Sequence, residues 1–238
     1  MKLGMLASFA LLLVFGLTTP AAAENADHLK QLLETNQCQG CDLSGANLAG
    51  ANLKGANLEE ANLKGANLTG TNLNEANLIK ANLTTARLQN ASLLAAKLHG
   101  AVLENANLSN ANLSLAGMVI ANLNNANLTK ANLIGTNLES ANLTGANLQN
   151  AVQTTANINM AEIGGTMHPI DIGGVNLRDA NLSNANLIGA NFSGSDLSGA
   201  NLAGANIEKA SFRNALLQNT IMPDGKPVES SVSLRNSP

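Results

Sequence analysis

An apolar residue recurs at every fifth position along most of this chain. The phrase Ala-Asn-Leu, followed by two variable residues, starts at Ala46 and again at Ala51, and it continues without a gap. If the leucine is taken as the centre of each unit, centres run through 43–163 and, in a shifted frame, through 177–222, which makes 25 and 10 units. The repeat predicts one continuous body instead of two ordinary domains.

Neither an α-helix nor a straight strand can bury residues spaced five apart. In a helix they are rotated by about 140° from one another, and in a strand an odd period sends them to alternate faces. All of them can be buried if the chain turns a corner in every unit, so that each unit forms one side of a polygonal coil. Leucine occupies 27 of the 35 centres and alanine 29 of the positions two residues earlier, which predicts a narrow core of one large and one small residue per side.

Two further positions of the unit have predicted structural roles. Glycines such as Gly45 and Gly50 stand two residues after a centre, where a corner needs backbone that tolerates positive φ. Asparagine precedes the centre in 23 of 35 units, and stacked coils would bring these amides into register. We interpret the asparagines as a hydrogen-bonded ladder, and surface recognition of sugar or ice as the less favoured alternative.

The first 23 residues have the pattern of a signal peptide. Lys2 precedes an apolar run over residues 3–17, and the segment ends at Ala23 in an Ala-x-Ala cleavage pattern. The run is shorter than the ~20 residues that span a bilayer, so export with cleavage is favoured over an uncleaved anchor. We therefore expect an exported protein, in a periplasm or a thylakoid lumen, without a membrane span after cleavage.

Residues 24–37 are expected to form a helical cap on the repeat. Asn25 or Asp27 can cap a short helix with Leu29, Leu32 and Leu33 on one face, and Asn36 can end it. Such a helix would cover the first coil and block stacking at an open strand edge.

Cys38 and Cys41 follow the helix with a C-x-x-C spacing. The extended frame makes Cys38 a centre and Cys41 the small residue before the next centre, so both side chains should point inward. A local disulfide and a pair of buried thiols remain open as interpretations. Redox or metal chemistry is disfavoured, because no βαβ setting and no further ligands accompany the pair.

Composition excludes several classes of function. The formal charge is −3 in the full chain, and basic residues do not cluster as phosphate-backbone binding requires. Tryptophan and tyrosine are absent, so aromatic platforms for bases or sugars are not available. No nucleophile and base pair, metal cluster or pocket-forming insertion is evident, and we predict a protein that is not an enzyme and needs no cofactor.

Tandem units of this kind, from Cys38 to Met222, resemble the pentapeptide repeat family. The resemblance implies an all-β solenoid, a right-handed quadrilateral β-helix with four units per coil. The best-known members of that family mimic DNA and protect topoisomerases, but they are cytoplasmic, more acidic and often have phenylalanine centres. This chain is more similar to exported members from cyanobacteria and the plant thylakoid lumen, many of which have no assigned activity.

Irregular units are better candidates for function than regular ones. From residue 87 to residue 102 the pre-centre column has no asparagine, and one coil later apolar residues stand at outward positions between 115 and 120, which predicts a protein-binding patch. Its residues are Arg87, Leu94, Lys97, Leu115, Val119 and Ile120.

The frame breaks at residues 164–174, between a first repeat segment over 38–163 and a second over 175–222. Either one side is a residue shorter or the segment loops out, and a bulge or kink is expected there. The last units carry apolar residues in place of asparagine, before a polar tail over 223–238. They predict either a homodimer contact or a surface that the tail covers, made of Phe212, Leu216, Leu217, Ile221 and Met222.

The pattern as a whole predicts a non-enzymatic scaffold that binds a protein of unknown identity. A DNA mimic that protects topoisomerases is the alternative, and direct binding of nucleic acid is not expected.

Overall fold

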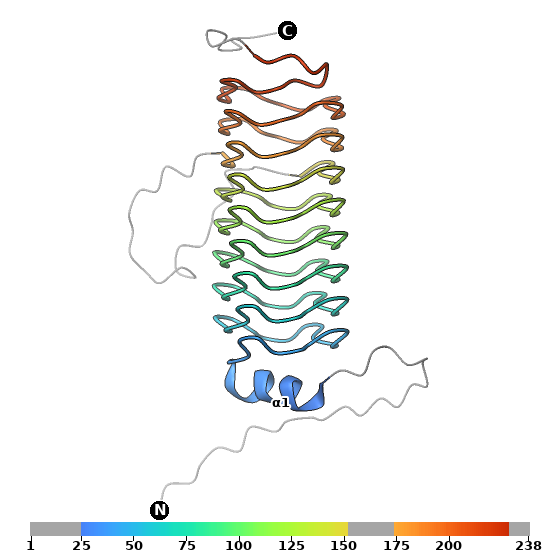
Figure 1. Cartoon of the computed structure of the whole chain (residues 1–238), viewed down its shortest axis with the longest axis vertical. Helices are drawn as coiled ribbons and strands as arrows, with labels where there is room; N and C mark the ends of the chain where they lie inside the picture. The colour runs from blue at the N-terminus through green and yellow to red at the C-terminus, as the bar shows by residue number, and fades with distance from the viewer. Residues whose placement is uncertain (1–24, 152–173, 229–238) are drawn as a thin grey trace, which may run out of the picture.

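The computed structural model describes residues 25–151 and 174–228. Parallel β-bridges join residues 20 apart, for example Asn57 to Asn77 and Asn77 to Lys97. Because one unit has five residues, each turn of the coil contains four units, and the coils stack into the upright column of Figure 1. The protein is therefore a β-solenoid with four sides, while its handedness stays a prediction from the resemblance.

Each side of the coil is named here by one of its bridge residues. The four bridged rows pass in chain order through Arg87, Ser92, Lys97 and Val102, which define the Arg87, Ser92, Lys97 and Val102 sides. The Arg87 and Lys97 sides are opposite each other, because two units separate them in a coil of four.

A tight turn at the end of every unit makes the corner. The carbonyl of Leu43 accepts the amide of Ala46 at 3.1 Å, and Gly45 between them has φ 70°. The predicted glycine corners are thus confirmed. Other residues adopt the same backbone at equivalent corners, for example Asn90 at φ 58° and Ile120 at φ 53°.

Backbone hydrogen bonds between successive coils hold the column together. The amide of Leu63 donates to the carbonyl of Asn82 at 2.7 Å, and the amide of Asn62 donates to the carbonyl of Cys41 at 2.8 Å. Each side contributes one bridged residue, so within the described residues the coil is built from single bridges and contains no longer strand.

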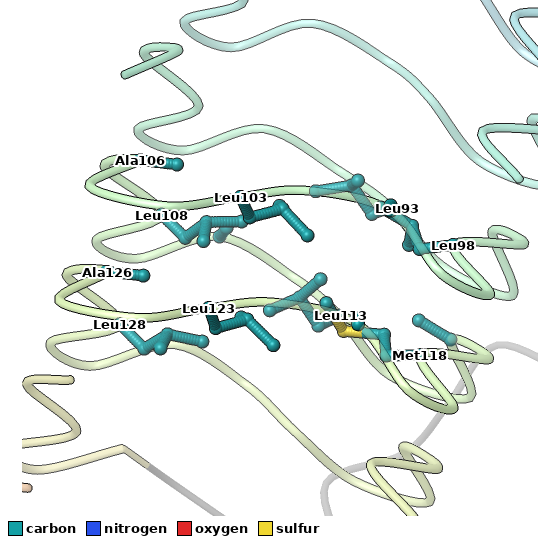
Figure 2. Close-up of a cluster of buried hydrophobic side chains, with 14 of the residues drawn as sticks. Leu93, Leu98, Leu103, Ala106, Leu108, Leu113, Met118, Leu123, Ala126 and Leu128 are labelled. Atoms are coloured by element: carbon teal, nitrogen blue, oxygen red, sulfur yellow. The ribbon is translucent and has the colours of Figure 1, made fainter. Parts of the chain in front are cut away.

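The core is a stack of leucine layers. Figure 2 shows Leu93, Leu98, Leu103 and Leu108 pointing inward from one coil above the corresponding residues of the next coil, where Met118 takes one place. Burial of each such leucine contributes about 1.5–3 kcal/mol before entropy. Threonine replaces alanine at three core positions, and each hydroxyl donates to a carbonyl of the preceding coil at 2.7–2.8 Å: Thr71 to Leu48, Thr136 to Leu113 and Thr220 to Leu197.

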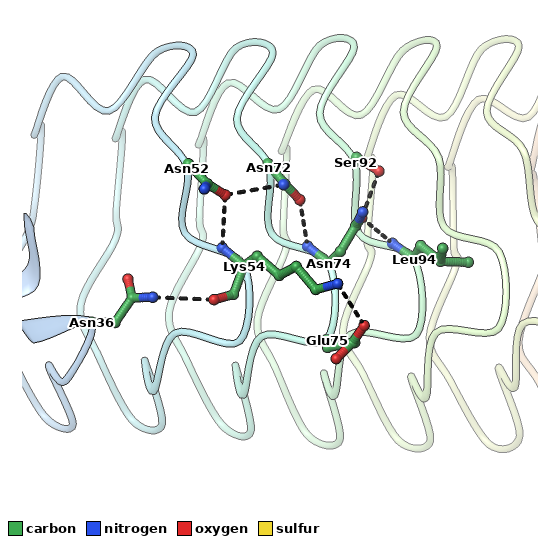
Figure 3. Close-up of polar contacts among 8 residues, drawn as sticks. All are labelled: Asn36, Asn52, Lys54, Asn72, Asn74, Glu75, Ser92 and Leu94. Atoms are coloured by element: carbon green, nitrogen blue, oxygen red, sulfur yellow. Dashed lines mark hydrogen bonds and ion pairs between the residues drawn. The ribbon is translucent and has the colours of Figure 1, made fainter. Parts of the chain in front are cut away.

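The asparagine column makes two kinds of hydrogen bond. Asn67 Nδ2 donates to Asn47 Oδ1 at 2.8 Å, and Asn72 repeats this contact with Asn52 at 3.0 Å, which confirms the predicted ladder at these positions. Asparagine Oδ1 atoms also accept the backbone amide two residues later, as in Figure 3, where Asn72 Oδ1 accepts the amide of Asn74 at 3.1 Å. The local bond is the side-chain turn typical of asparagine, and sequence analysis did not predict it.

Helix α1, Ala26–Thr35, lies across the first coil (Figure 1). Asn25 is its N-cap and accepts the amide of His28 at 3.2 Å, while Asn36 ends the helix at φ 58°. Leu32 is fully buried against the coil and Leu29 is partly buried. The prediction that Leu33 shares this face is wrong, since Leu33 is 52% exposed.

The two repeat segments stack on each other without a change in geometry. Asn137 pairs with Asn176, 39 residues later, where the regular frame would place Asn157. The 22 residues between Ala151 and Gly174 therefore replace a connection of three residues. The predicted frame break at 164–174, apart from its last residue, the last three centres of the first segment and the leader over 1–23 lie outside the described residues.

Candidate functional site

The residues of the predicted binding patch lie on three sides of the coil. Arg87 is on the side opposite Lys97, because ten residues are two units. Leu115 is at the corner between the Ser92 and Lys97 sides, and Val119 and Ile120 follow on the Lys97 side. The structure thus brings Lys97, Val119 and Ile120 together and leaves Arg87 apart from them.

Leu94 is not available to a partner. It lies on the Ser92 side in a row with Ser114 and Ile134, and the three residues are 4%, 2% and 6% exposed. The row is covered because each residue packs between the coils on either side. In Figure 3 the amide of Leu94 donates to Asn74 Oδ1 at 3.1 Å, beside the hydroxyl of Ser92. The prediction that Leu94 forms part of an exposed patch is therefore wrong.

Ile120 is the prominent residue of the Lys97 side. Its side chain is 54% exposed, and its backbone φ of 53° places it in the left-handed region. A β-branched residue rarely adopts this conformation, because the side chain crowds the backbone at a cost of about 1–2 kcal/mol. The neighbouring corner below it is Gly100, whose Cβ, if present, would lie 3.9 Å from Ile120 Cδ1.

Gly117 has no side chain and so leaves an open place in the column of pre-centre side chains on the same side, which is called the hollow below. It is the only glycine of the 35 pre-centre positions, and its bridge neighbours in the row are Lys97 and Asn137. A Cβ added at Gly117 would meet no atom within 4 Å. The side chain of Val119 is half-buried in the same unit, so the hollow has an apolar border and a cationic one.

Charged residues of both signs surround this surface. Lys80 pairs with Glu60 at 3.3 Å, and Glu139 Oε2 accepts Asn176 Nδ2 at 3.4 Å. Lys97 and His99 are exposed, and Lys97 has no ion pair within residues 25–151 and 174–228. The opposite side is mostly uncharged, with Thr69, Gln89, Ser109, Thr129 and Gln149 next to its centres.

Cys38 and Cys41 form a disulfide, so the interpretation as buried thiols is not the one found. Their Cα atoms are 5.2 Å apart, and both residues are buried where α1 meets the first coil. At the same junction, His28 Nδ1 accepts the amide of Asp42 at 3.0 Å. Hydrogen bonds from the hydroxyl and amide of Ser44 hold the pKa of Asp42 below its ordinary value.

The described part of the chain contains no group of three or more metal-ligating residues that could hold an ion. Among its helices, none has the length and apolar character to span a bilayer.

Within residues 174–228, the last coil is covered on one side. After Met222 the chain turns back, so that Ile221 bridges Pro227 in the antiparallel sense and Val228 packs against the core. Phe212 is partly buried and stacks on Phe192 with 5.5 Å between ring centroids.

The predicted dimer contact is thus not equally accessible. Leu217 is 5% exposed and Leu216 is 60% exposed, while Phe212, Ile221 and Met222 are intermediate. The backbone amides of Ile207, Phe212 and Leu217 have no hydrogen-bond partner among the described residues.

The family model for pentapeptide repeats matches in eight copies, over residues 37–75, 76–114, 121–152 and 176–214. The chain belongs to the pentapeptide repeat family. No curated protein sequence matches it. Several solved structures of pentapeptide repeat proteins match this chain.

HetL, a pentapeptide repeat protein involved in heterocyst differentiation regulation in Nostoc sp. PCC 7120, is 34% identical. The match covers 81% of this chain and 76% of HetL, with a TM-score of 0.55. A trypsin-treated form of QnrB1, a plasmid-mediated fluoroquinolone resistance protein, is 19% identical over 82% of this chain and 87% of its own, with a TM-score of 0.50. A pentapeptide repeat protein of the Arabidopsis thaliana thylakoid lumen is 31% identical over 49% of this chain and 71% of its own, with a TM-score of 0.24.

The resemblance to the pentapeptide repeat family is thereby confirmed. QnrB1 adds only a likeness of fold, because its sequence identity is low.

Proposed function

We propose that this pentapeptide repeat protein is a non-enzymatic scaffold that binds a protein partner through the Lys97 side, in a periplasm or a thylakoid lumen. The observation that supports this most is Ile120, a large apolar residue that is exposed and held in left-handed backbone. The fold does not need isoleucine there, since Gly100 and Ser140 occupy the neighbouring corners of the same row. A residue that costs folding energy and buries little of itself is better explained by contact with another molecule.

The surface around Ile120 has the composition of a protein contact. Val119 adds apolar area, and Lys97 and Lys80 supply cations at the border. Protein interfaces commonly combine an apolar centre with a polar rim. The similarity to HetL, whose described role is regulatory, is consistent with action through binding and not through catalysis.

Export rests on the sequence of residues 1–23. Amino-terminal sequencing of the protein from fractionated cells should find a chain that begins at Glu24 in the periplasmic or lumenal fraction. Recovery of the intact amino terminus in the cytoplasm would contradict export.

Mimicry of DNA is less well supported by the surface. A mimic needs a continuous row of negative charge, whereas carboxylates on the Lys97 side alternate with Lys80, Lys97 and Arg178. Arg178 lies 4.0 Å from Asp196, which neutralises part of the row. A supercoiling assay would test this alternative directly, because a mimic without the leader should protect DNA gyrase from fluoroquinolone.

We also propose that the last coil can form a homodimer. The amides of Ile207, Phe212 and Leu217, which have no partner among the described residues, form an open strand edge, and Leu216 is exposed beside it. A second copy can pair with such an edge and cover the apolar end.

Site-specific crosslinking tests the partner surface. A photoreactive benzoylphenylalanine at Ile120 should give a single crosslinked adduct in the native compartment. The matched control is Asn110, which is also an exposed corner residue with positive φ, at 57°, but lies on the Arg87 side. Equal adducts from both positions, or none from Ile120, would contradict the assignment of the Lys97 side.

A further inference from the structure

We propose that the hollow at Gly117 receives a carboxylate side chain from an acidic segment of the partner, with an apolar side chain of that segment lying on Val119 and Ile120. This inference rests on the proposed function and specifies the chemistry of the partner at that surface.

The backbone does not explain a glycine at this place. Gly117 has no positive φ, and a side chain there would meet nothing within 4 Å. Every other pre-centre position carries a side chain, most often asparagine, which forms the local turn and the ladder. An asparagine would fit the site and would add hydrogen bonds. The glycine is therefore best explained by the space that it leaves open.

Hydrogen-bond donors border the hollow on both sides along the column. Lys97 and Asn137 are the bridge neighbours of Gly117, so the two residues are two coils apart, about 10 Å along the axis. Asn137 Oδ1 already accepts the amide of Glu139 at 3.0 Å, so its Nδ2 is the atom that can donate. Lys97 carries a positive charge without an ion pair in the described residues. An ammonium and an amide N–H group together favour an anionic acceptor.

The neighbouring residues favour a peptide carboxylate over nucleic acid. Binding of a phosphate backbone requires several clustered cations, whereas Lys80 is paired with Glu60 and Glu139 adds a negative charge nearby. Val119 and Ile120 add an apolar surface next to Lys97, which has no ion pair in the described residues, and His99 stands beside it. A segment that alternates acidic and aliphatic residues matches both features.

The test uses a fluorescein-labelled peptide of alternating glutamate and leucine, with the full-length protein and fluorescence anisotropy. Gly117→Asn fills the hollow with the residue of the repeat, and we expect at least a tenfold rise in Kd, about 1.4 kcal/mol. Lys97→Asn should raise Kd about two- to fivefold, as for an exposed ion pair, and high salt should weaken wild-type binding.

Two matched variants control for these changes. Ser92→Asn also restores the asparagine column but on a different side, and Arg87→Asn removes one cation from the opposite side. Neither should change the Kd, and a glutamine peptide should bind less tightly than the glutamate peptide. Thermal unfolding of Gly117→Asn should match or exceed that of wild type, which separates loss of binding from loss of fold.

Three results would overturn the inference. The first is no binding of the glutamate peptide at up to about 1 mM, a concentration at which affinity is negligible. The others are equal binding of the glutamine peptide, and a Kd that is unchanged in both Gly117→Asn and Lys97→Asn. If crosslinking through Ile120 still succeeds in any of these cases, the Lys97 side remains a partner surface and only the acidic occupant is wrong. If crosslinking fails while the peptide binds, the proposed function fails and the hollow remains an acidic-peptide site.

Discussion

The two ends of the solenoid are closed in different ways. At the first coil, α1 places Leu32 over the core, the hydrogen bond of His28 with Asp42 joins the helix to the coil, and the Cys38–Cys41 disulfide closes the chain just after the helix. At the last coil, residues 223–228, the last that the structure describes, fold back over one side. A stack of identical coils exposes its core and its unpaired strand edge at both ends, so each end needs its own capping element. Among the described residues, the amino-terminal end is thus closed by α1, whereas the last coil is covered beside Ile221 and leaves Leu216 60% exposed.

The largest difference between the ends should come from Leu32. Replacement of a fully buried leucine by alanine costs about 2–5 kcal/mol, and Leu32→Ala should destabilise the protein within that range in urea unfolding. Leu33→Ala on the same helix is the matched control, and its effect should stay within about 0.5 kcal/mol because Leu33 is half exposed. Equal effects of the two variants would mean that α1 does not pack as described.

Loss of the disulfide should have a smaller effect at the same end. The loop from Cys38 to Cys41 is short, and the chain-entropy model gives about 2 kcal/mol for closing it. Cys38→Ala combined with Cys41→Ala should therefore lower stability by about that amount. Hydrogen exchange should locate the loss in α1 and the first coil. Faster exchange in the last coil instead would show that the two ends are coupled.

The other end is tested by self-association. Leu216→Asp should raise the dimer Kd at least tenfold, about 1.4 kcal/mol, in sedimentation velocity. Its effect on folding should be slight, because Leu216 is 60% exposed. Leu33→Asp, at the opposite end and similarly exposed, should leave association unchanged. A wild-type protein that stays monomeric at all concentrations would contradict the dimer.

The smallest expected effect is a pH dependence at the first coil. The pKa of Asp42 is lowered in the folded protein, chiefly by the Ser44 hydroxyl, so the folded state binds this proton less readily than the unfolded state. The stabilisation is complete above the ordinary pKa of 3.8 and is lost as pH falls below it. Asp42→Asn should therefore lose stability less steeply than wild type as the pH falls below 3.8. Parallel curves would contradict this prediction.

Sequence analysis predicted the coil because every unit repeats the same local rule. Leucine centres, alanines and corner glycines are local properties, and each appears in the structure at its predicted position. Leu94 was misplaced because its burial depends on the adjacent coils, where residues 74 and 114 occupy the equivalent positions. The sequence marks Leu94 as outward within its unit but does not show how tightly a row packs.

The position of Arg87 could have been predicted more accurately. Four units per coil place residues ten apart on opposite sides, so Arg87 and Lys97 cannot share a surface. Gly117 also stood out in the sequence as the one glycine in the asparagine column. Its meaning depends on φ and on the free space around it, which only the structure provides. Likewise, the exposure of Ile120 supports a partner surface only because the structure shows left-handed backbone at that corner.

The change of spacing between Asn137 and Asn176 has a practical consequence. The coils on either side of it stack with unaltered hydrogen bonds, and Leu138 donates to the carbonyl of Asn176 at 2.7 Å as its counterparts do elsewhere. The connection on the Ser92 side can thus differ in length by 19 residues without disturbing its neighbours. The connection between Ala151 and Gly174 is therefore a suitable insertion site for a foreign sequence, because the flanking coils keep their stacking whatever the length of the connection.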